Sequence, residues 1–201
     1  MMTPATPLGA SRIVAGALKG YDNFDVVAMA RRGIWFTNVP DLLTEPTADL
    51  GVALLLALGR NLLPADRHMR RGDFFGWQPL FYGRGIAGTV VGIIGMGAVG
   101  RALAKRLAPF GARIIYHDRK LSDTADLASI GACEASIETV IAEADYLFPL
   151  THLYPATYHL LDHAQIATMK PTASIINIGR GALVNESAIA DALSADRLAG
   201  Y

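Results

Sequence analysis

The stretch that decides the fold reads Thr89-Val90-Val91-Gly92-Ile93-Ile94-Gly95-Met96-Gly97-Ala98-Val99-Gly100. An apolar run that predicts a buried strand passes directly into a GxGxxG pattern that opens a helix. Gly95 permits a tight turn, Gly97 lets a pyrophosphate approach the backbone, and Gly100 lets the helix pack closely on the strand. The amides of Ala98 and Val99 then point at the phosphates from the positive end of the helix. We therefore expect a dinucleotide-binding loop here.

An acidic residue follows this loop at the spacing that a dinucleotide site requires. Asp118 stands 18 residues after Gly100, at the end of the next apolar run. A carboxylate there accepts hydrogen bonds from the adenosine ribose hydroxyls and repels a 2′-phosphate, so NAD is the expected cofactor rather than NADP. The adjacent Arg119 would soften that preference. The alternative is a glycine-rich structural turn followed by a chance surface aspartate.

Apolar runs alternate with helical segments from residue 89 onward. Strands are expected at 89–94, 113–117, 146–148 and 174–178, and helices at 98–107, 137–142, 164–169 and 186–193. The strand candidates are continuously apolar, which is typical of a parallel sheet that is covered on both faces. The expected fold class is therefore α/β, a doubly wound parallel sheet of the Rossmann type.

Two domains are expected. Residues 1–45 carry short strand candidates at 13–15 and 34–37 around a helix candidate at 26–32, and they would form part of a substrate domain. Residues 46–201 would form the NAD-binding domain. Its parts are a linker helix at 47–63 bounded by Pro46 and Pro64, an aromatic arm at 67–88, and the core at 89–201.

Composition excludes several classes of protein. Apolar residues make up 52% and charged residues 18%, as in a globular chain. Basic and acidic residues number 18 each, which gives no drive toward nucleic acid or an anionic membrane. The longest apolar run, residues 50–58, is half of what a bilayer requires. Cys133 is the only cysteine and no metal-ligand cluster is visible, so we expect no metal and a cytoplasmic location.

Several further segments, in order along the chain, match one family. They read Lys19-Gly20-Tyr21-Asp22-Asn23-Phe24-Asp25, Asn38-Val39-Pro40-Asp41, Ala53-Leu54-Leu55-Leu56-Ala57-Leu58-Gly59-Arg60, and Asn177-Ile178-Gly179-Arg180-Gly181. With the glycine loop, they resemble the D-2-hydroxyacid dehydrogenases over nearly the whole chain. The resemblance implies an oxidoreductase that transfers a hydride between NAD and a small anionic substrate.

Within that family the likeness is greatest to phosphite dehydrogenases. The segments that carry it are Ala17–Asp25, Val39–Thr44, Gly76–Pro79 and Phe81–Gly83. The resemblance implies that Arg180 binds the substrate anion and stabilises charge during hydride transfer, with Lys19 and Gly20 beside it. It also implies that Trp77 and Tyr82 close the pocket and that Thr47 and Ile178 line the nicotinamide. The alternatives are a solvated turn lysine at 19 and plain packing or dimer contacts for the two aromatic residues.

The sequence also departs from the family. The family's catalytic Glu and His have no match here, and the five histidines stand at none of its catalytic positions. We therefore expect a fragment that is short at both ends and inactive alone. Pro149 stands where a central strand should still run. His152-Leu153 replaces Pro-Leu, and Ile178 stands where phosphite dehydrogenases carry Pro.

Four functions follow as hypotheses. Phosphite oxidation with NAD is the first, because of Lys19, Trp77 and Tyr82. The second is a 2-hydroxyacid dehydrogenase of the glyoxylate or hydroxypyruvate reductase type. A non-catalytic NAD-sensing interaction module and a ligand-free structural fragment are the others, because fold alone does not fix function. The apolar helix and the aromatic arm also predict a homodimer.

Overall fold

The computed structural model describes residues 11–119 and 124–201. These residues fall into two compact units that divide between Thr44 and Glu45. The division expected from the sequence lies one residue later, after position 45. Each unit is described by itself.

The first unit contains a small parallel sheet. Strands β1 (Ile13–Ala15) and β2 (Trp35–Thr37) pair in parallel, and α1 (Val26–Arg31) connects them. The carboxylate of Asp25 begins α1 by accepting a hydrogen bond of 2.8 Å from the amide of Ala28. The three elements fall where the apolar runs predict them.

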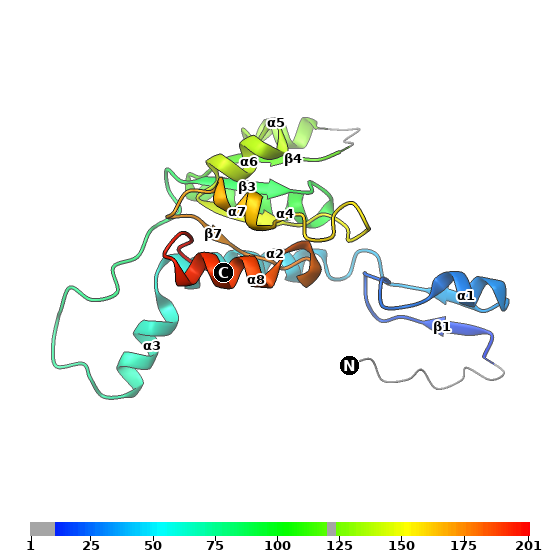
Figure 1. Cartoon of the computed structure of the whole chain (residues 1–201), viewed down its shortest axis with the longest axis horizontal. Coiled ribbons are helices and arrows are strands. Elements are labelled where there is room, and N and C mark those ends of the chain that lie inside the picture. Colours follow the sequence, from blue (N-terminus) through cyan, green and yellow to red (C-terminus); the bar gives the residue numbers. More distant parts are fainter. Residues whose placement is uncertain (1–10, 120–123) are drawn as a thin grey trace. The chain divides into compact units, whose positions relative to one another are not determined.

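The second unit is built on a five-stranded parallel sheet. Its strands are β3 (Val90–Ile94), β4 (Arg113–His117), β5 (Cys133–Glu134), β6 (Tyr146–Pro149) and β7 (Ser174–Ile175). They lie in the order β5-β4-β3-β6-β7, and every pair is parallel (Figure 1). The strand order therefore reverses between β3 and β6. The expected α/β class with a Rossmann-type sheet is confirmed.

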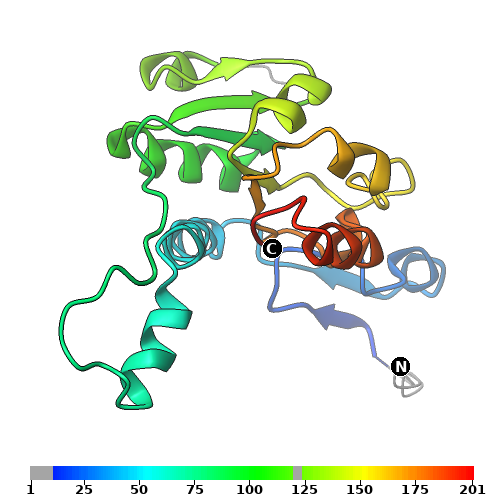
Figure 2. The ribbon, with the colours of Figure 1, turned by 60° about the vertical axis from the view of Figure 1, so that its left-hand side comes forward.

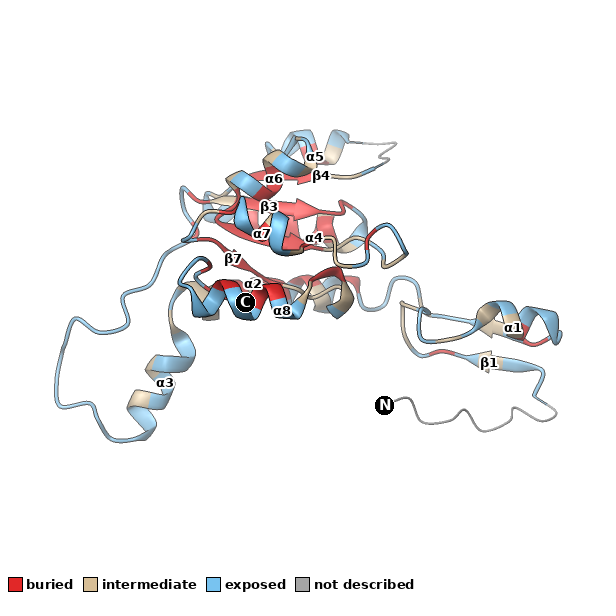
Figure 3. Ribbon diagram, viewed as in Figure 1, coloured by how far each residue is buried: buried red, intermediate tan, exposed pale blue. Residues whose placement is uncertain are grey.

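Helices cover both faces of this sheet. One face carries α2 (Thr44–Gly59), α4 (Ala98–Leu107) and α5 (Ala125–Ser129), and the other carries α6 (Ile137–Glu143), α7 (His163–Ala167) and α8 (Glu186–Ser194). Neighbouring strand residues alternate between the two cores: Ile93 and Phe148 lie in the first, Ile94 and Leu147 in the second. The sheet is consequently the most buried part of the chain (Figure 3). Its burial on both faces explains why the strands read as unbroken apolar runs.

The single linker helix expected at 47–63 is wrong. The structure has two helices, α2 and α3 (Leu62–Arg70), and the break falls at Asn61, whose φ of 52° is left-handed. Pro46 and Pro64 lie inside the first turns of α2 and α3 rather than outside a helix. A proline is tolerated there because the first N–H groups of a helix have no partner within it.

Among the described residues, no single helix has the length and apolar character to span a membrane. The pair α2 and α3 passes that test only when taken together, and it is bent by 66°.

Two strands differ from expectation at their ends. β6 continues through Pro149, which is in register with Ile94 of β3. The carbonyl of Leu147 accepts from the amide of Ile176 on the β7 side. By the two-residue alternation of a strand, the nitrogen of Pro149 faces the same side, where β7 has already ended at Ile175. The strand expected at 174–178 is accordingly short. Besides α3, the described residues form elements that were not expected: α5, β5, and the 3₁₀ turns η1 (Ala108–Phe110) and η2 (Gly181–Leu183).

The arm expected at 67–88 is irregular only after its first residues, since 67–70 belong to α3. Figure 2 shows α3 and the following chain projecting from the sheet. The arm returns at Arg84, whose amide donates a 2.6 Å hydrogen bond to the carbonyl of Gly59. This hydrogen bond closes the base of the projecting segment between Gly59 and Arg84.

One buried carboxylate fixes the arm to the sheet. Asp145, at the start of β6, is 4% exposed. It accepts hydrogen bonds from the amide of Val90 at 2.8 Å and from Nζ of Lys170 at 3.0 Å, and it pairs with Nη1 of Arg84 at 3.1 Å. Burial acts to raise the pKa of Asp145, but these three donors outweigh it and lower that pKa below its usual value.

Candidate functional site

The glycine loop lies where the strand order of the sheet reverses. Gly95 directly follows β3 and has a φ of +101°, which side chains rarely adopt. A Cβ added to Gly95 would lie 2.7 Å from the amide nitrogen of Thr151, which follows β6. The loops after β3 and β6 therefore touch at the carboxyl edge of the sheet, the place where ligands bind in folds of this type.

The three glycines of the pattern play different parts. A Cβ on Gly100 would lie 2.4 Å from the carbonyl oxygen of Gly95. The close approach at Gly100 is therefore to the glycine loop, whereas we expected it to be to the strand. A Cβ on Gly97 would meet nothing within 4 Å. Packing therefore requires glycine at 95 and 100, whereas at 97 the absent side chain leaves open space in front of the backbone.

The N-terminus of α4 lies at the open space in front of Gly97. Gly97 is the N-cap of α4 and supplies no side-chain cap, and Gly97 and Ala98 are exposed while Val99 is half-buried. The first-turn amides of an α-helix have no partner within the helix and carry partial positive charge. These residues fit the pyrophosphate of a dinucleotide, because the phosphate oxygens can reach amides that no side chain covers.

Asp118 lies at the same crevice. It follows β4, and its Oδ2 accepts a 2.7 Å hydrogen bond from the amide of Met96 within the glycine loop. A second link holds the two segments together, since the amide of Gly95 donates to the carbonyl of His117 at 2.8 Å. The carboxylate thus faces the loop, and its contact with a ribose stays a prediction.

The loop after β6 is braced by one hydroxyl. Thr157 is buried, and its Oγ1 accepts from the amide of Tyr154 at 3.0 Å and donates to the carbonyl of His152 at 2.7 Å. The guanidinium of Arg119 lies over the ring of Tyr154, with 5.1 Å between Cζ and the ring centroid. The sequence over 151–158 has no periodic pattern, so neither contact was foreseen.

Arg180 stands on a second loop at this edge. The side chain of Asn177 braces that loop: its Oδ1 accepts from the amide of Gly179 at 3.1 Å, and its Nδ2 donates to the carbonyl of Arg180 at 2.9 Å. Arg180 is half-buried. A Cβ on Gly179 would lie 2.8 Å from the carbonyl oxygen of Pro149, so the loop touches the end of β6. Asn177 is a site residue that sequence reasoning missed.

Ile178 packs against α2, the helix that also carries Thr47. A Cβ on Gly51 would lie 2.9 Å from Cδ1 of Ile178, so α2 packs closely on that side chain. Thr47 is half-buried and lies one turn before Gly51 on the same side of the helix. Their expected place beside the nicotinamide remains a prediction.

The remaining predicted residues lie apart from this edge or in the other unit. Lys19 and Gly20 are half-buried in the first unit, where Nζ of Lys19 donates to Oγ1 of Thr44 at 3.3 Å. Trp77 and Tyr82 are on the arm, and their side chains are 79% and 74% exposed. The second unit by itself therefore shows no pocket closed by these two rings.

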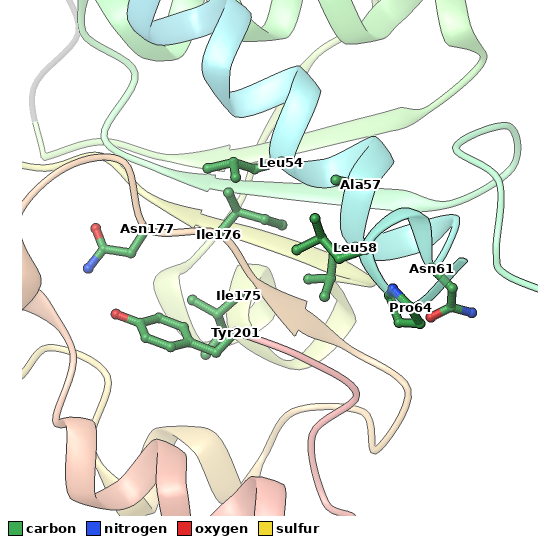
Figure 4. A pocket seen from close by; sticks show the side chains of 10 residues that line it. Leu54, Ala57, Leu58, Asn61, Pro64, Ile175, Ile176, Asn177 and Tyr201 are labelled. Atoms are coloured by element: carbon green, nitrogen blue, oxygen red, sulfur yellow. The ribbon is translucent and has the colours of Figure 1, made fainter. Parts of the chain in front are cut away.

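An apolar hollow of about 410 Å³ opens between α2 and the segment at and after the end of β7, and Asn177 is part of its lining as well as of the Arg180 loop. Figure 4 shows Leu54, Ala57 and Leu58 of α2 on one side and Ile175 and Ile176 on the other. Its lining shares no residue with the glycine loop, Asp118 or the loop after β6. Within residues 11–119 and 124–201, no group of three His, Cys, Asp or Glu side chains could hold a metal ion.

A cluster of polar and ionisable side chains links α7 to α8, after the Arg180 loop in the chain. Nδ1 of His163 lies 2.9 Å from Oδ1 of Asp162, and its Nε2 lies 3.1 Å from Oδ2 of Asp191. The side-chain Nδ2 of Asn185 donates to Oδ1 of Asp162 at 2.8 Å. The backbone amide of Asn185 donates to the carbonyl of Leu161. The hydrogen bond to Asp191, and then the one to Asp162, raises the pKa of His163 above its usual value.

A pH dependence follows from this cluster. A raised pKa means that the His163 contacts stabilise the fold below about pH 6.5, the unfolded value, and that this contribution is lost as the pH rises through the folded pKa. We expect Asp191→Asn to lower the His163 titration midpoint measured by NMR, because it removes the largest cause. Asp66→Asn, a change at an exposed carboxylate on α3, is the control and should leave it unchanged. An equal midpoint in all three proteins would contradict the prediction.

Comparison with known proteins identifies the family. Residues 52–201 match the family model described as the NAD-binding domain of the D-isomer specific 2-hydroxyacid dehydrogenases. The chain belongs to the D-isomer specific 2-hydroxyacid dehydrogenase family. A glyoxylate reductase of Thermococcus litoralis is 41% identical over 194 residues, which cover 94% of this chain and 58% of the relative.

Solved structures of this dehydrogenase family agree. A glyoxylate reductase from Paecilomyes thermophila superposes with a TM-score of 0.84 at 31% identity, over 94% of this chain and 56% of that one. The NAD-complexed D-isomer specific 2-hydroxyacid dehydrogenase from Lactobacillus delbrueckii ssp. bulgaricus gives 0.79 at 26% identity, over 94% and 56%.

Two facts follow for this member of the family. The family model is that of an NAD-binding domain, so the cofactor of the second unit is NAD, as expected. The chain spans about 58% of the length of the first curated relatives that it matches. The activity, substrate and partners of the whole protein are therefore matters for proposal.

Proposed function

We propose that this chain is the cofactor-binding part of an NAD-dependent 2-hydroxyacid dehydrogenase whose substrate is glyoxylate or a similar small 2-oxo acid. The observation that carries the proposal is the carboxyl edge of the sheet. There the open Gly97 backbone follows β3, the carboxylate of Asp118 follows β4, and the Arg180 loop follows β7, all strands of one parallel sheet. Glyoxylate reductases among the relatives supply the substrate class.

Each residue has a proposed part. The amides of Ala98 and Val99 hold the pyrophosphate, and Asp118 accepts from the adenosine ribose. When bound, NADH supplies the hydride that reduces the carbonyl carbon. Arg180 binds the substrate carboxylate and stabilises the charge that develops on the neighbouring oxygen. Thr47 and Ile178 exclude water from the nicotinamide side.

Glyoxylate reduction replaces phosphite oxidation as the first hypothesis. The relatives reported above favour the hydroxyacid alternative, and none of them is a phosphite enzyme. The cation on which the phosphite hypothesis depends, Lys19, donates to Thr44 within its own unit. A non-catalytic NAD-sensing module keeps the same cofactor site and becomes an outcome of the test.

The test measures binding of the cofactor and then of two substrate-like anions. The chain is titrated with NADH by calorimetry, then with oxalate, an unreactive analogue of glyoxylate, in the presence of NADH. We expect NADH to bind, and oxalate binding to fall about tenfold to 100-fold in Arg180→Ala. Arg197→Ala, at an exposed arginine after α8, is the control. Phosphite is titrated into the NAD complex in the same way, which separates the two substrates without turnover by a chain that is expected to be inactive alone.

Four outcomes would overturn the proposal. Absence of NADH binding would exclude the cofactor site. Oxalate binding that is unaffected by Arg180→Ala would exclude the proposed role of that guanidinium. Phosphite binding to the NAD complex that is tighter than oxalate binding to the NADH complex would restore the phosphite hypothesis. NADH binding with no binding of oxalate to the complex would favour the sensing module.

We also propose that the protein is a cytoplasmic homodimer. Leu50 and Leu54 on α2 and the aromatic residues Phe75 and Trp77 on the arm are exposed, and together they offer more apolar surface than a monomer usually presents. The lone cysteine, Cys133, is free, which suits a reducing compartment. Light scattering should give twice the chain mass, and Phe75→Ser with Trp77→Ser should give the monomer. A monomeric native chain would disprove the dimer.

A further inference from the structure

The guanidinium of Arg180 is held against the backbone of its own loop. Its Nη1 donates a hydrogen bond of 3.1 Å to the carbonyl of Gly179. An arginine side chain that is restrained before an anion arrives loses less rotamer entropy when it binds that anion. The direction of the Gly179 carbonyl therefore bears on how the guanidinium meets a substrate.

The side chain of Asn177 fixes the backbone on both sides of that carbonyl. Its Oδ1 accepts a hydrogen bond from the amide of Gly179 at 3.1 Å, and its Nδ2 donates to the carbonyl of Arg180 at 2.9 Å. These two groups belong to the peptides before and after the one that carries the Gly179 carbonyl. Each peptide is planar, so the middle one turns only through the φ and ψ angles that join it to its neighbours. Fixing both neighbours restrains the carbonyl that holds Arg180.

An asparagine suits this position in the loop. Residues 176–180 belong to neither a helix nor a strand, so side-chain contacts have a large share in fixing their backbone. The amide of asparagine offers an acceptor and a donor at once, whereas alanine offers neither. Asn177 is half-buried and lines the apolar hollow beside α2 (Figure 4), so a smaller side chain fits there without a clash.

We propose that Asn177 is a positioning residue for the substrate: it fixes the Gly179 carbonyl and thereby the direction in which the Arg180 guanidinium meets the substrate carboxylate. This inference rests on the proposed function, because it takes Arg180 as the cation that binds the substrate. Asn177 acts through Arg180 and not on the anion itself. Two other roles are distinguishable from this one, namely a direct contact of Asn177 with the anion and a purely structural role in the loop.

The test measures the affinity of the NADH complex for oxalate by calorimetry. Asn177→Ala should weaken oxalate binding about threefold to tenfold, because the guanidinium is no longer held in one direction, and should leave NADH binding within about twofold. Asn177→Ser should weaken it less, since a serine hydroxyl can still accept from the amide two residues later. In Arg180→Ala protein, the further change Asn177→Ala should alter oxalate binding less than about twofold, since the residue through which Asn177 acts is absent.

Asn185→Ala is the matched control, because Asn185 is a second asparagine that binds backbone and side chain in this part of the chain. Its Nδ2 donates to Oδ1 of Asp162 at 2.8 Å, and its Oδ1 accepts from the amide of Ser187 at 3.0 Å at the start of α8. Its loss should lower the thermal unfolding midpoint and leave the oxalate affinity within about twofold. The same midpoint shows that each Asn177 variant is folded, and Asn177→Ser carries the test if Asn177→Ala does not fold.

The outcomes separate this inference from the proposed function. Oxalate binding that is unchanged in both Asn177 variants would overturn the inference alone. An equal loss from Asn177→Ala with and without Arg180 would also overturn it, in favour of a direct contact, and an equal loss in Asn185→Ala would leave only a structural role. A native chain that binds no NADH or no oxalate, or oxalate binding unaffected by Arg180→Ala, would overturn the proposed function and this inference with it. A loss of oxalate affinity that is confined to the Asn177 variants and disappears in Arg180→Ala protein would support the assignment.

Discussion

Gly97→Val is expected to reduce NADH affinity by about 100-fold or more while the domain stays folded. The substituted side chain would enter the open space in front of the helix N-terminus, where no protein atom lies within 4 Å of an added Cβ. Two charge-assisted hydrogen bonds to phosphate, each of about 1.5–3 kcal/mol, account for a loss of that size. The backbone at 97 (φ −73°) suits any residue, and loss of a good N-cap costs only about 1 kcal/mol. Calorimetric titration with NADH and urea unfolding measure the two quantities.

Valine at position 100 should lower the stability of the domain, whereas valine at position 97 should lower its affinity for NADH. A Cβ at 100 would lie 2.4 Å from a backbone carbonyl that cannot rotate away, so Gly100→Val should destabilise the domain by about 3 kcal/mol. This matched pair distinguishes a glycine that leaves room for a ligand from one that leaves room for the protein. Equal stability losses in the two variants, or unchanged NADH binding in Gly97→Val, would refute the assignment of the loop.

Asp145→Ala should destabilise the second unit by about 2–3 kcal/mol. The larger part arises from the buried Val90 amide, which would lose its acceptor. The ion pairs contribute less because Arg84 and Lys170 are 48% and 37% exposed, so water screens their charges. Asp66→Ala, which breaks an exposed pair with Arg70 on α3, is the control and should cost under about 0.5 kcal/mol in urea unfolding. Similar losses in both variants would contradict the anchoring role.

The pH dependence of this variant has a definite sign. The pKa of Asp145 is lowered in the folded protein, so its contribution is complete above about pH 4, the value in the unfolded chain. As the pH falls through the lower folded pKa, that contribution is lost. The stability difference between the native protein and Asp145→Ala should therefore shrink below pH 4. A difference that stays constant down to pH 2 would show that the carboxylate charge has no part in it.

Local patterns predicted the elements that depend on near neighbours in the chain. The apolar run before Gly95 became β3, and the helix expected at 98–107 has the bounds that the structure gives α4. The single helix expected across 47–63 was wrong, because apolar composition does not indicate that the backbone at Asn61 is left-handed. Pro149 was likewise judged by its type, whereas its tolerance depends on where β7 ends.

The sequence by itself determined the fold class, the glycine loop and the acid after the next strand, since each is set by residue type at short spacing. Only the tertiary structure decided which loops meet. The order β5-β4-β3-β6-β7 brings Thr151, at the start of the loop after β6, against Gly95 of the glycine loop. In the same loop after β6, the ring of Tyr154 lies under the guanidinium of Arg119. The contact of Arg119 with Tyr154 joins residues far apart in the chain, so it depends on strand order and packing, which no local spacing encodes. The Asn177 contacts are local, but their geometry depends on the backbone course of the loop.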